Sequence, residues 1–356
     1  MTPFSDLDQA MMRRALALAE QGLFTATPNP RVGCVLAQGD RVVGEGWHEK
    51  AGAPHAEANA LAAAGAHARG ATAYLNLEPC AHQGRTPPCA DALATAGVTR
   101  VVAALRDPNP EAGGGGDKLA AAGVRFEHGL MESEARELNI GFVSRVTRGR
   151  PWVRMKLAAT LDGRTALANG KSQWITGAAA RKDGHRWRAR ACAVLTGIGT
   201  VKADDPRLTV REVETPRQPL RVIVDSRLET PPEAKILQGG KTLIFFGDTA
   251  NKPPQGAEAI AMPNAKGKVD LAAMLRELAR RGVNELHVEA GFKLNGSLAR
   301  EGCVDEMLIY LAPAFLGDSA QGMLDLAPRA SLDERLNVSL RSVERVGEDL
   351  RIIARL

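Results

Sequence analysis

The sequence predicts a protein of two α/β domains, and three observations support this. At 356 residues the chain is about twice the ~150 residues of an ordinary domain. From residue 31 onward, short apolar runs alternate with Ala-rich helical stretches, which is typical of layered α/β folds. The alternation restarts after a basic segment with Gly and Pro at 145–151. We therefore expect one domain over residues 1–148 and another over 149–356.

The first domain is expected to begin with an amphipathic helix within residues 1–22. Ser5 precedes this helix and Asp8 follows three residues later, as in a capping box. The order of the later elements predicts a three-layer α/β pattern. These elements are a strand at 32–37, a turn at 39–40, a strand at 42–43, a helix at 54–64, a strand at 73–77, a helix at 89–96, a strand at 101–105, a helix at 118–122 and a strand at 124–127.

The second domain is predicted to be another α/β unit. Pro-rich stretches at 206–219 and 251–263 are typical of surface loops. The expected elements are strands at 152–159, 192–196, 220–225, 242–246, 285–289 and 307–311, a helix at 271–281 and a strand pair near 343–356.

Composition and charge limit the classes of partner. The chain is 44% hydrophobic, 24% charged and 4% aromatic, as expected of a soluble globular protein. Its formal charge of +5 comes from Lys and Arg interleaved with Asp and Glu, which favours anionic small molecules over nucleic acid. No stretch approaches 18 apolar residues, and five cysteines are an odd, sparse set. We expect a cytoplasmic protein without membrane partners.

Four residues of the first domain form a pattern with catalytic chemistry. His55 opens a predicted helix, Cys80 follows a strand, and Cys89 opens another helix. One His and two Cys are a suitable ligand set for a catalytic zinc ion that keeps its fourth position for water. Helix N-termini also help to keep the thiolates ionised. Glu57 lies close enough to move protons between water, ring nitrogen and leaving amine. The set predicts hydrolytic deamination of an amino-substituted ring.

Each of these residues also has a structural interpretation. His55 could cap a helix, Glu57 could be solvated, and both cysteines could belong to the core. His82 lies between the two cysteines and is a candidate ligand, although a loop histidine facing substrate or solvent is favoured. The other cysteines lie in or beside apolar runs and are expected to be inert core thiols: Cys34, Cys192 and Cys303.

Two glycine turns mark the second domain. The strand at 193–196 runs into 197–200, and the strand at 285–289 runs into 290–297. Backbone N–H groups in such turns can bind phosphate, although neither turn is a full dinucleotide fingerprint and each could be only a tight connection. Arg188 and Arg211 could clamp a sugar phosphate, and surface salt bridges are the alternative.

Longer motifs in the first domain resemble a known family. Two of them are Pro28-Asn29-Pro30-Arg31-Val32-Gly33 and Asp107-Pro108-Asn109-Pro110, and the third is the segment 78–89 with eight residues between its cysteines. Together with His55-Ala56-Glu57 they resemble the deaminase half of the bifunctional riboflavin biosynthesis deaminase-reductases. The resemblance implies a cytidine-deaminase-like α/β/α fold with bound Zn²⁺. It also implies deamination of 2,5-diamino-6-(5-phosphoribosylamino)pyrimidin-4(3H)-one. The run 113–116 has more glycines than the family usually carries.

The resemblance continues into the second domain. The segments 155–164, 172–176, 199–211 and 288–291 are similar to the reductase half of the same family, with Thr160 where the family often has serine. This implies a dihydrofolate-reductase-like α/β fold. It also implies NADPH-dependent reduction of the ribosyl group of 5-amino-6-(5-phosphoribosylamino)uracil to ribityl. We expect phosphoribosyl-pyrimidine substrates as partners, and a homo-oligomer.

The resemblance assigns roles to matching positions. Lys156 and Glu289 are both candidates for the proton donor of the reduction, and the alternative for Lys156 is that it only orients the open-chain sugar. The implied cofactor contacts are Ala158, Trp174, Thr200, Asp204, Ser226, Gly291, Phe292, Lys293, Leu294, Asn295, Gly296 and Ser297. The implied substrate contacts are Ser172, Arg188, Leu208, Arg211 and Glu289.

The choice of NADPH over NADH needs a cation or N–H group at the 2′-phosphate, and a carboxylate beside the ribose would repel that phosphate. Asp204 is therefore expected to contact another part of the cofactor. We expect Lys202, Arg227 or a backbone N–H group to bind the 2′-phosphate.

Two rival functions remain at this point. A deaminase acting on nucleic-acid bases needs a basic stripe with stacking aromatics, yet the chain has only two Tyr and eight Phe. Alternatively, the second domain could be a non-catalytic binding or oligomerisation domain. The cluster of polar residues around its glycine turns argues against that alternative.

Overall fold

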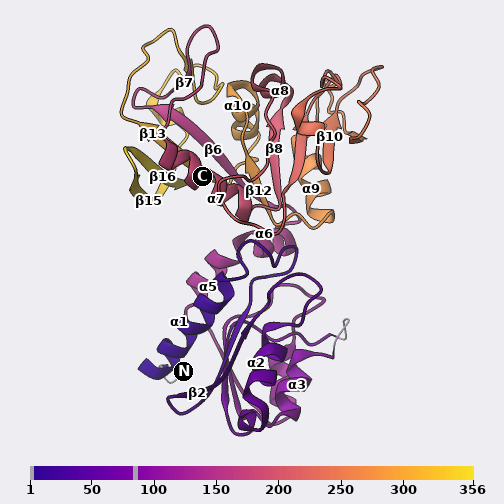
Figure 1. Cartoon of the computed structure of the whole chain (residues 1–356), viewed down its shortest axis with the longest axis vertical. Helices are drawn as coiled ribbons and strands as arrows, with labels where there is room; N and C mark the ends of the chain where they lie inside the picture. The colour runs from indigo at the N-terminus through magenta and orange to yellow at the C-terminus, as the bar shows by residue number, and fades with distance from the viewer. Residues whose placement is uncertain (1–3, 83–86) are drawn as a thin grey trace. The chain divides into compact units, whose positions relative to one another are not determined.

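A computed structural model describes residues 4–82 and 87–356, and the chain divides into two units. The division falls between Gly149 and Arg150, one residue beyond the boundary that the sequence predicts. Each unit is built around its own sheet (Figure 1). No helix in the described part of the chain is long and apolar enough to cross a membrane.

The first unit contains a five-stranded sheet in the order β2-β1-β3-β4-β5. β1 is antiparallel to both β2 and β3, while β3, β4 and β5 are parallel to one another. The strands span β1 Gly33–Gln38, β2 Arg41–Trp47, β3 Thr72–Leu77, β4 Arg100–Leu105 and β5 Arg125–His128. The helices span α1 Asp6–Glu20, α2 Ala56–Ala64, α3 Cys89–Thr95, α4 Gly115–Ala121, α5 Glu132–Leu138 and α6 Ile140–Arg148, with a 3₁₀ turn at Gly65–Ala68.

Alternation along the strands gives this sheet two buried faces. Cys34 and Leu36 of β1 pack in one core with residues of α2, α3 and α4, whereas Val35 and Ala37 pack in a second core with α1, α5 and α6. The expected three-layer α/β/α fold is therefore confirmed, with α1 and α2 on opposite sides of the sheet (Figure 1).

Two helices of the first unit differ in how well the sequence predicts them. The Ser5 hydroxyl accepts from the Asp8 N–H at 3.1 Å, and the Asp8 carboxylate accepts from the Ser5 N–H at 3.0 Å, which is the predicted capping box. By contrast, the sequence analysis did not predict α5. Only Ala135 of its seven residues is buried, so it carries almost no apolar periodicity.

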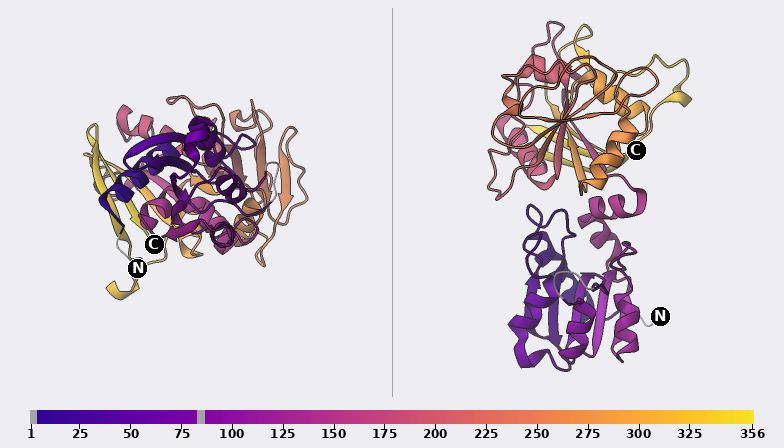
Figure 2. Two further views of the ribbon diagram at one scale, coloured as in Figure 1. Left: turned by 90° about the horizontal axis from the view of Figure 1, so that it is seen from below. Right: turned by 90° about the vertical axis from the view of Figure 1, so that its right-hand side faces the viewer.

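The second unit contains a nine-stranded sheet in the order β11-β10-β9-β8-β12-β6-β13-β16-β15. The strands from β11 to β13 in this order run parallel, and β16 and β15 add an antiparallel edge. The right-handed twist fans the strands out, as Figure 2 shows. The strands span β6 Trp152–Thr160, β8 Ala193–Gly197, β9 Leu220–Val224, β10 Thr242–Phe246, β11 Glu258–Ala261, β12 Glu285–Val288, β13 Glu306–Ala312, β15 Ser339–Val346 and β16 Asp349–Arg355, and β7 Arg164–Ala166 pairs separately with β14 Gln321–Gly322.

Helices cover both faces of this sheet. Apolar residues of β6, such as Val153 and Met155, pack in one core with α9 and α10. Arg154 faces the opposite side, where its guanidinium lies 4.4 Å from the ring centre of Trp187 on α7. The helices span α7 Ala178–Arg190, α8 Ile198–Asp204, α9 Leu271–Arg280 and α10 Phe292–Arg300, with 3₁₀ turns at Lys235–Leu237 and Leu332–Glu334.

Two features of the second unit differ from the sequence prediction. The stretch 251–263 is not entirely a loop, because β11 lies within it and pairs with β10. The sequence analysis also did not predict α7, which is rich in Arg, Lys and Ala. Only Ala180, His185 and Ala189 of this helix are buried, so its apolar face is too narrow to be read from the sequence.

Candidate functional site

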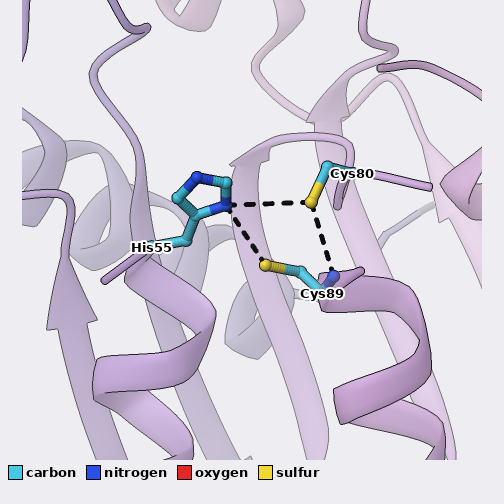
Figure 3. A group of neighbouring side chains, drawn as sticks. All are labelled: His55, Cys80 and Cys89. Carbon is cyan, nitrogen blue, oxygen red and sulfur yellow. Dashed lines mark hydrogen bonds between the residues drawn. The ribbon is translucent and has the colours of Figure 1, made fainter. Parts of the chain in front are cut away.

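In the first unit, two helix starts and one loop bring His55, Cys80 and Cys89 together. His55 is the N-cap residue of α2, Cys89 is the first residue of α3, and Cys80 lies three residues beyond β3. His55 Nδ1 lies 3.3 Å from Cys89 Sγ and 3.7 Å from Cys80 Sγ, and the Cys89 N–H donates to Cys80 Sγ at 3.4 Å (Figure 3). The three ligand atoms lie within 4.8 Å of one another.

This donor set fits a catalytic zinc ion. One imidazole and two thiols match the ligand chemistry of Zn²⁺, and no fourth His, Cys, Asp or Glu from residues 4–82 and 87–356 joins the cluster. His82 is exposed and lies outside the cluster, while 83–86 are not among the described residues. Hydrogen bonding from Cys89 and His55 lowers the pKa of the Cys80 thiol to about 4, which favours the thiolate form that binds metal.

Glu57 lies beside this cluster as the second residue of α2. Its side chain is buried, with 4% of the residue exposed. Burial raises the pKa of the Glu57 carboxyl to about 7, although the charge of His55 opposes the shift. A carboxyl group that titrates near neutral pH can both accept and return a proton.

His48 links the cluster to the Pro28-Asn29-Pro30 motif, and the sequence analysis did not single it out. Its ring stands edge-on to that of His55, with 5.5 Å between the centres. The Asn29 amide donates to His48 Nε2 at 3.0 Å, and His48 Nδ1 donates to the Pro54 carbonyl at 3.0 Å. The position of Asn29 is thereby tied to the backbone next to His55. A single histidine after a strand gives no signal of this role in the sequence.

The glycine run 113–116 packs against the segment that carries Cys80. A Cβ atom on Gly115 would lie 1.8 Å from the Pro79 carbonyl oxygen, and one on Gly116 would lie 2.3 Å from the Phe126 ring. Gly114 has a φ of +90°, which favours glycine. The run is therefore a tightly packed turn that leads into the first residues of α4.

Glu78 joins the same turn to the Asp107-Pro108-Asn109-Pro110 motif. Its two carboxylate oxygens accept from the Gly116 N–H at 2.7 Å and from the Asp107 N–H at 2.9 Å. Burial raises the pKa of the Asp107 carboxyl to about 6. Glu78 thus holds three chain segments together two residues before Cys80.

In the second unit, a cavity of about 1610 Å³ opens beyond the carboxyl ends of parallel strands. All the predicted substrate residues line it, and so do the predicted cofactor residues except Gly296. A Cβ on Gly296 would lie 2.3 Å from the Asp325 carbonyl oxygen, so this glycine allows α10 to pack closely against residue 325. The lining residues from the prediction are Ala158, Ser172, Trp174, Arg188, Thr200, Asp204, Leu208, Arg211, Ser226, Glu289, Gly291, Phe292, Lys293, Leu294, Asn295 and Ser297.

Arg188 and Glu289 form an ion pair in the cavity wall. Arg188 Nε and Nη2 donate to the two carboxylate oxygens of Glu289 at 2.7 and 2.9 Å, and Nη1 donates to the Thr209 carbonyl at 2.6 Å. The predicted phosphate clamp is therefore divided: Arg188 is engaged with Glu289, while Arg211 is exposed and donates to Thr209. The carbonyl of Thr209 could not be recognised from a side-chain pattern.

The charges of the cavity suit anionic ligands, since Lys and Arg side chains outnumber Asp and Glu along its lining. Of the two cations considered for a 2′-phosphate, Arg227 lines the cavity, and its Nε lies 3.2 Å from Glu229. Lys202 is not a lining residue and contacts Glu229 at 2.5 Å. Burial raises the pKa of Asp204.

Trp174 offers a flat surface at the cavity. It is 70% exposed, and the Arg181 guanidinium lies 4.7 Å from its ring centre. Arg181 also lines the cavity and donates to the Thr176 carbonyl at 2.6 Å. The sequence analysis named Trp174 but not Arg181, since the contact depends on the fold of 172–181.

Comparison with known proteins adds independent findings. Residues 151–352 match the model of the RibD C-terminal domain, and residues 5–105 match that of the cytidine and deoxycytidylate deaminase zinc-binding region. The chain is 45% identical to riboflavin biosynthesis protein RibD of Escherichia coli, covering 96% of this chain and 98% of that protein. It is also 45% identical to RibD of Haemophilus influenzae, covering 99% and 98%.

Solved structures agree over the full length. A structure of Acinetobacter baumannii RibD superposes with a TM-score of 0.91 at 42% identity and covers 98% of both chains. A Thermotoga maritima diaminohydroxyphosphoribosylaminopyrimidine deaminase/5-amino-6-(5-phosphoribosylamino)uracil reductase superposes with a TM-score of 0.89 at 31% identity, again covering 98% of both chains.

Proposed function

The chain belongs to the RibD family of bifunctional riboflavin biosynthesis proteins, and we propose that its two units carry out the two successive reactions of that family. The first unit deaminates 2,5-diamino-6-(5-phosphoribosylamino)pyrimidin-4(3H)-one. The second reduces the ribosyl group of 5-amino-6-(5-phosphoribosylamino)uracil to ribityl with NADPH. The observation that carries this proposal is the presence of both sites in one chain: a three-ligand cluster with a buried glutamate, and a large cavity with a cationic lining.

In the deaminase unit, His55, Cys80 and Cys89 hold the zinc ion. The ion supplies the Lewis acid that activates water for attack on the ring. Glu57 takes a proton from the water and returns protons to the ring nitrogen and the departing amine. The pKa of about 7 for Glu57 supports this role, because both protonation states are accessible near neutrality.

In the reductase unit, NADPH supplies the hydride for the sugar carbon. The turns at 197–200 and 291–297 would hold the cofactor together with Trp174 and Ser226, a role supported by the place of these segments in the cavity lining. Arg227 binds the 2′-phosphate, a role supported by its place in the cavity wall. Ser172, Leu208 and Arg211 contact the phosphoribosyl-pyrimidine.

The charges of the cavity favour Lys156 over Glu289 as the proton donor. Burial raises the pKa of Glu289, but Arg188, His287 and Lys156 together outweigh burial and leave the pKa well below its ordinary value. Glu289 therefore remains a carboxylate at neutral pH and has no proton to give. Burial lowers the pKa of Lys156, which makes its ammonium group a better acid, although the Glu289 carboxylate opposes this shift. Lys156 donates the proton, and Glu289 accepts hydrogen bonds from the sugar.

A non-catalytic second domain is not favoured. Residues 151–352 match the RibD C-terminal domain, and the polar residues of the family motif line one cavity. A domain that served only for oligomerisation would have no need of a half-buried Lys156 beside an ion pair in a cavity wall.

The protein works as a homo-oligomer in the cytoplasm. The edge strand β15 supports an assembly through the second unit, since its Leu340 and Val343 are 65% and 54% exposed next to an unpaired sheet edge. Free thiols at Cys80 and Cys89 support a reducing compartment, because oxidation would remove both sulfur ligands.

The direct test supplies the purified diaminopyrimidine substrate with and without NADPH. Ammonia release in both samples, with NADPH oxidation following in one, is the expected result. Ammonia release without any NADPH oxidation would leave only the deaminase, and absence of both would overturn the proposal.

A further inference from the structure

His287 is a buried histidine behind the reductase cavity to which neither the motif nor the proposed reaction gives a role. It lies on β12 with 1% of its surface exposed, two residues before Glu289. Because side chains alternate along a strand, His287 and Glu289 project from the same face of the sheet. His287 Nε2 lies 3.4 Å from Glu289 Oε1. His287 and Arg188 thus approach the same oxygen of Glu289.

The neighbours of His287 determine which of its two ring nitrogens carries the proton. Burial lowers the pKa of His287, so the ring is neutral and has a single N–H. Nδ1 has no hydrogen-bond partner among the described residues. Arg154, which stands opposite His287 in the β12–β6 register, is engaged by Glu285 at 2.9 Å. A proton on Nε2 would face the carboxylate oxygen 3.4 Å away, whereas a proton on Nδ1 would leave two acceptors facing each other.

The two oxygens of Glu289 are consequently unequal. Oε1 accepts from Arg188 Nε at 2.7 Å and faces His287 Nε2. Oε2 accepts, among the described residues, only from Arg188 Nη2 at 2.9 Å. A carboxylate oxygen has two accepting positions, so a donor at His287 Nε2 would fill Oε1, while Oε2 keeps one position for a ligand in the cavity that Glu289 lines.

We infer that His287 is a positioning residue of the reductase site. Its Nε2–H occupies the second accepting position of Glu289 Oε1, which fixes the carboxylate and directs Oε2 to a hydroxyl group of the phosphoribosyl substrate. This inference rests on the proposed reduction and adds a residue that determines how tightly the sugar is held.

Two substitutions separate this role from simple packing. His287→Gln can place an amide N–H near the position of Nε2, whereas His287→Asn places it near the position of Nδ1, away from Glu289. We expect His287→Asn to raise the KM for the aminouracil substrate about fivefold, with kcat within about twofold, because one hydrogen bond to a charged group is lost. His287→Gln restores KM to within about twofold of the unmodified protein.

The same experiment includes controls for folding of each unit and for the reductase activity of the unmodified protein. The Kd for NADPH, measured by fluorescence, reports whether the reductase unit of each variant is folded, and ammonia release reports the deaminase. If the unmodified protein does not oxidise NADPH with the aminouracil substrate, the proposed function itself fails. If it does and the two variants have the same KM, the positioning role of His287 is wrong.

A measurement on the unmodified protein covers the case in which His287→Asn does not fold. Nitrogen NMR of protein labelled with ¹⁵N-histidine, with the His287 signals assigned through their loss in His287→Gln, reports which nitrogen bears hydrogen. A proton on Nε2 and a bare Nδ1 are expected. The opposite tautomer, or a doubly protonated ring at neutral pH, overturns the inference.

Discussion

In the first unit, three ligand atoms meet within 4.8 Å at the starts of two helices and one loop, whereas the second unit spreads its site over a cavity of about 1610 Å³ lined from many strand ends. The candidate metal cluster consists of three residues from short motifs, and we expect each of them to be required for activity. The cavity depends on contacts between distant segments, such as Arg188 with Glu289, 101 residues apart. We therefore expect single substitutions to abolish the deaminase activity but only to weaken the reductase activity.

The largest single effect is expected at Glu57. Glu57→Ala removes the group proposed to move the protons, and we expect ammonia release to fall by about 10²- to 10⁴-fold. Zinc content, measured by mass spectrometry, stays at one ion per chain because the three ligands remain. Ammonia release close to that of the unmodified protein would show that another group transfers the protons.

An intermediate effect is expected at Arg188. Arg188→Met removes a charged side chain that donates two hydrogen bonds to Glu289. The reductase kcat/KM should therefore fall by about 10- to 100-fold at neutral pH. The matched control is Arg186→Met on the same helix, where the arginine is exposed, and it should change kcat/KM by less than about twofold.

The pH profile of the reductase activity also tests the contact between Arg188 and Glu289. In the unmodified protein the pKa of Glu289 is held well below its ordinary value, so the carboxylate and its contribution to stability are lost only in strong acid. Without Arg188, burial remains and raises the pKa. The acid limb of the reductase profile should therefore move to higher pH in Arg188→Met. An unchanged limb would mean that Glu289 is not the group that titrates.

The smallest effects concern stability. Gly115→Ala forces a Cβ to within 1.8 Å of the Pro79 carbonyl and should destabilise the first unit by about 1–3 kcal/mol. Gly184→Ala, in the middle of α7 with nothing within 4 Å of the added Cβ, should stabilise the second unit by about 0.5–1 kcal/mol. Denaturant unfolding of each variant measures both, and equal effects would contradict the tight packing of the glycine run.

The same contrast explains how much the sequence could predict. The capping box at Ser5 and the strands of both sheets other than β11 follow from local patterns. So do the candidate metal ligands, because His55 and Cys89 stand at helix starts that the sequence marks. In the cavity, the glycine turns and the pair Arg188 and Arg211 could be proposed from the residues, whereas the separate cofactor and substrate roles came from the resemblance.

Other features of the two sites depend on contacts that the sequence does not display. The edge-on contact of His48 with His55 and the approach of His287 to Glu289 depend on strand register and loop path. The polar helix α7 lacks a clear apolar stripe, so the sequence does not indicate that Arg188 lies on a helix.

The central claim is that one chain holds two separate active sites, and Cys80→Ser tests it most directly. Ammonia release from the diaminopyrimidine and NADPH oxidation with supplied aminouracil are measured on the same preparation. The account predicts that ammonia release is lost, because a zinc ligand is weakened, while NADPH oxidation continues at nearly the rate of the unmodified protein. Loss of both activities in a protein that remains folded would contradict it.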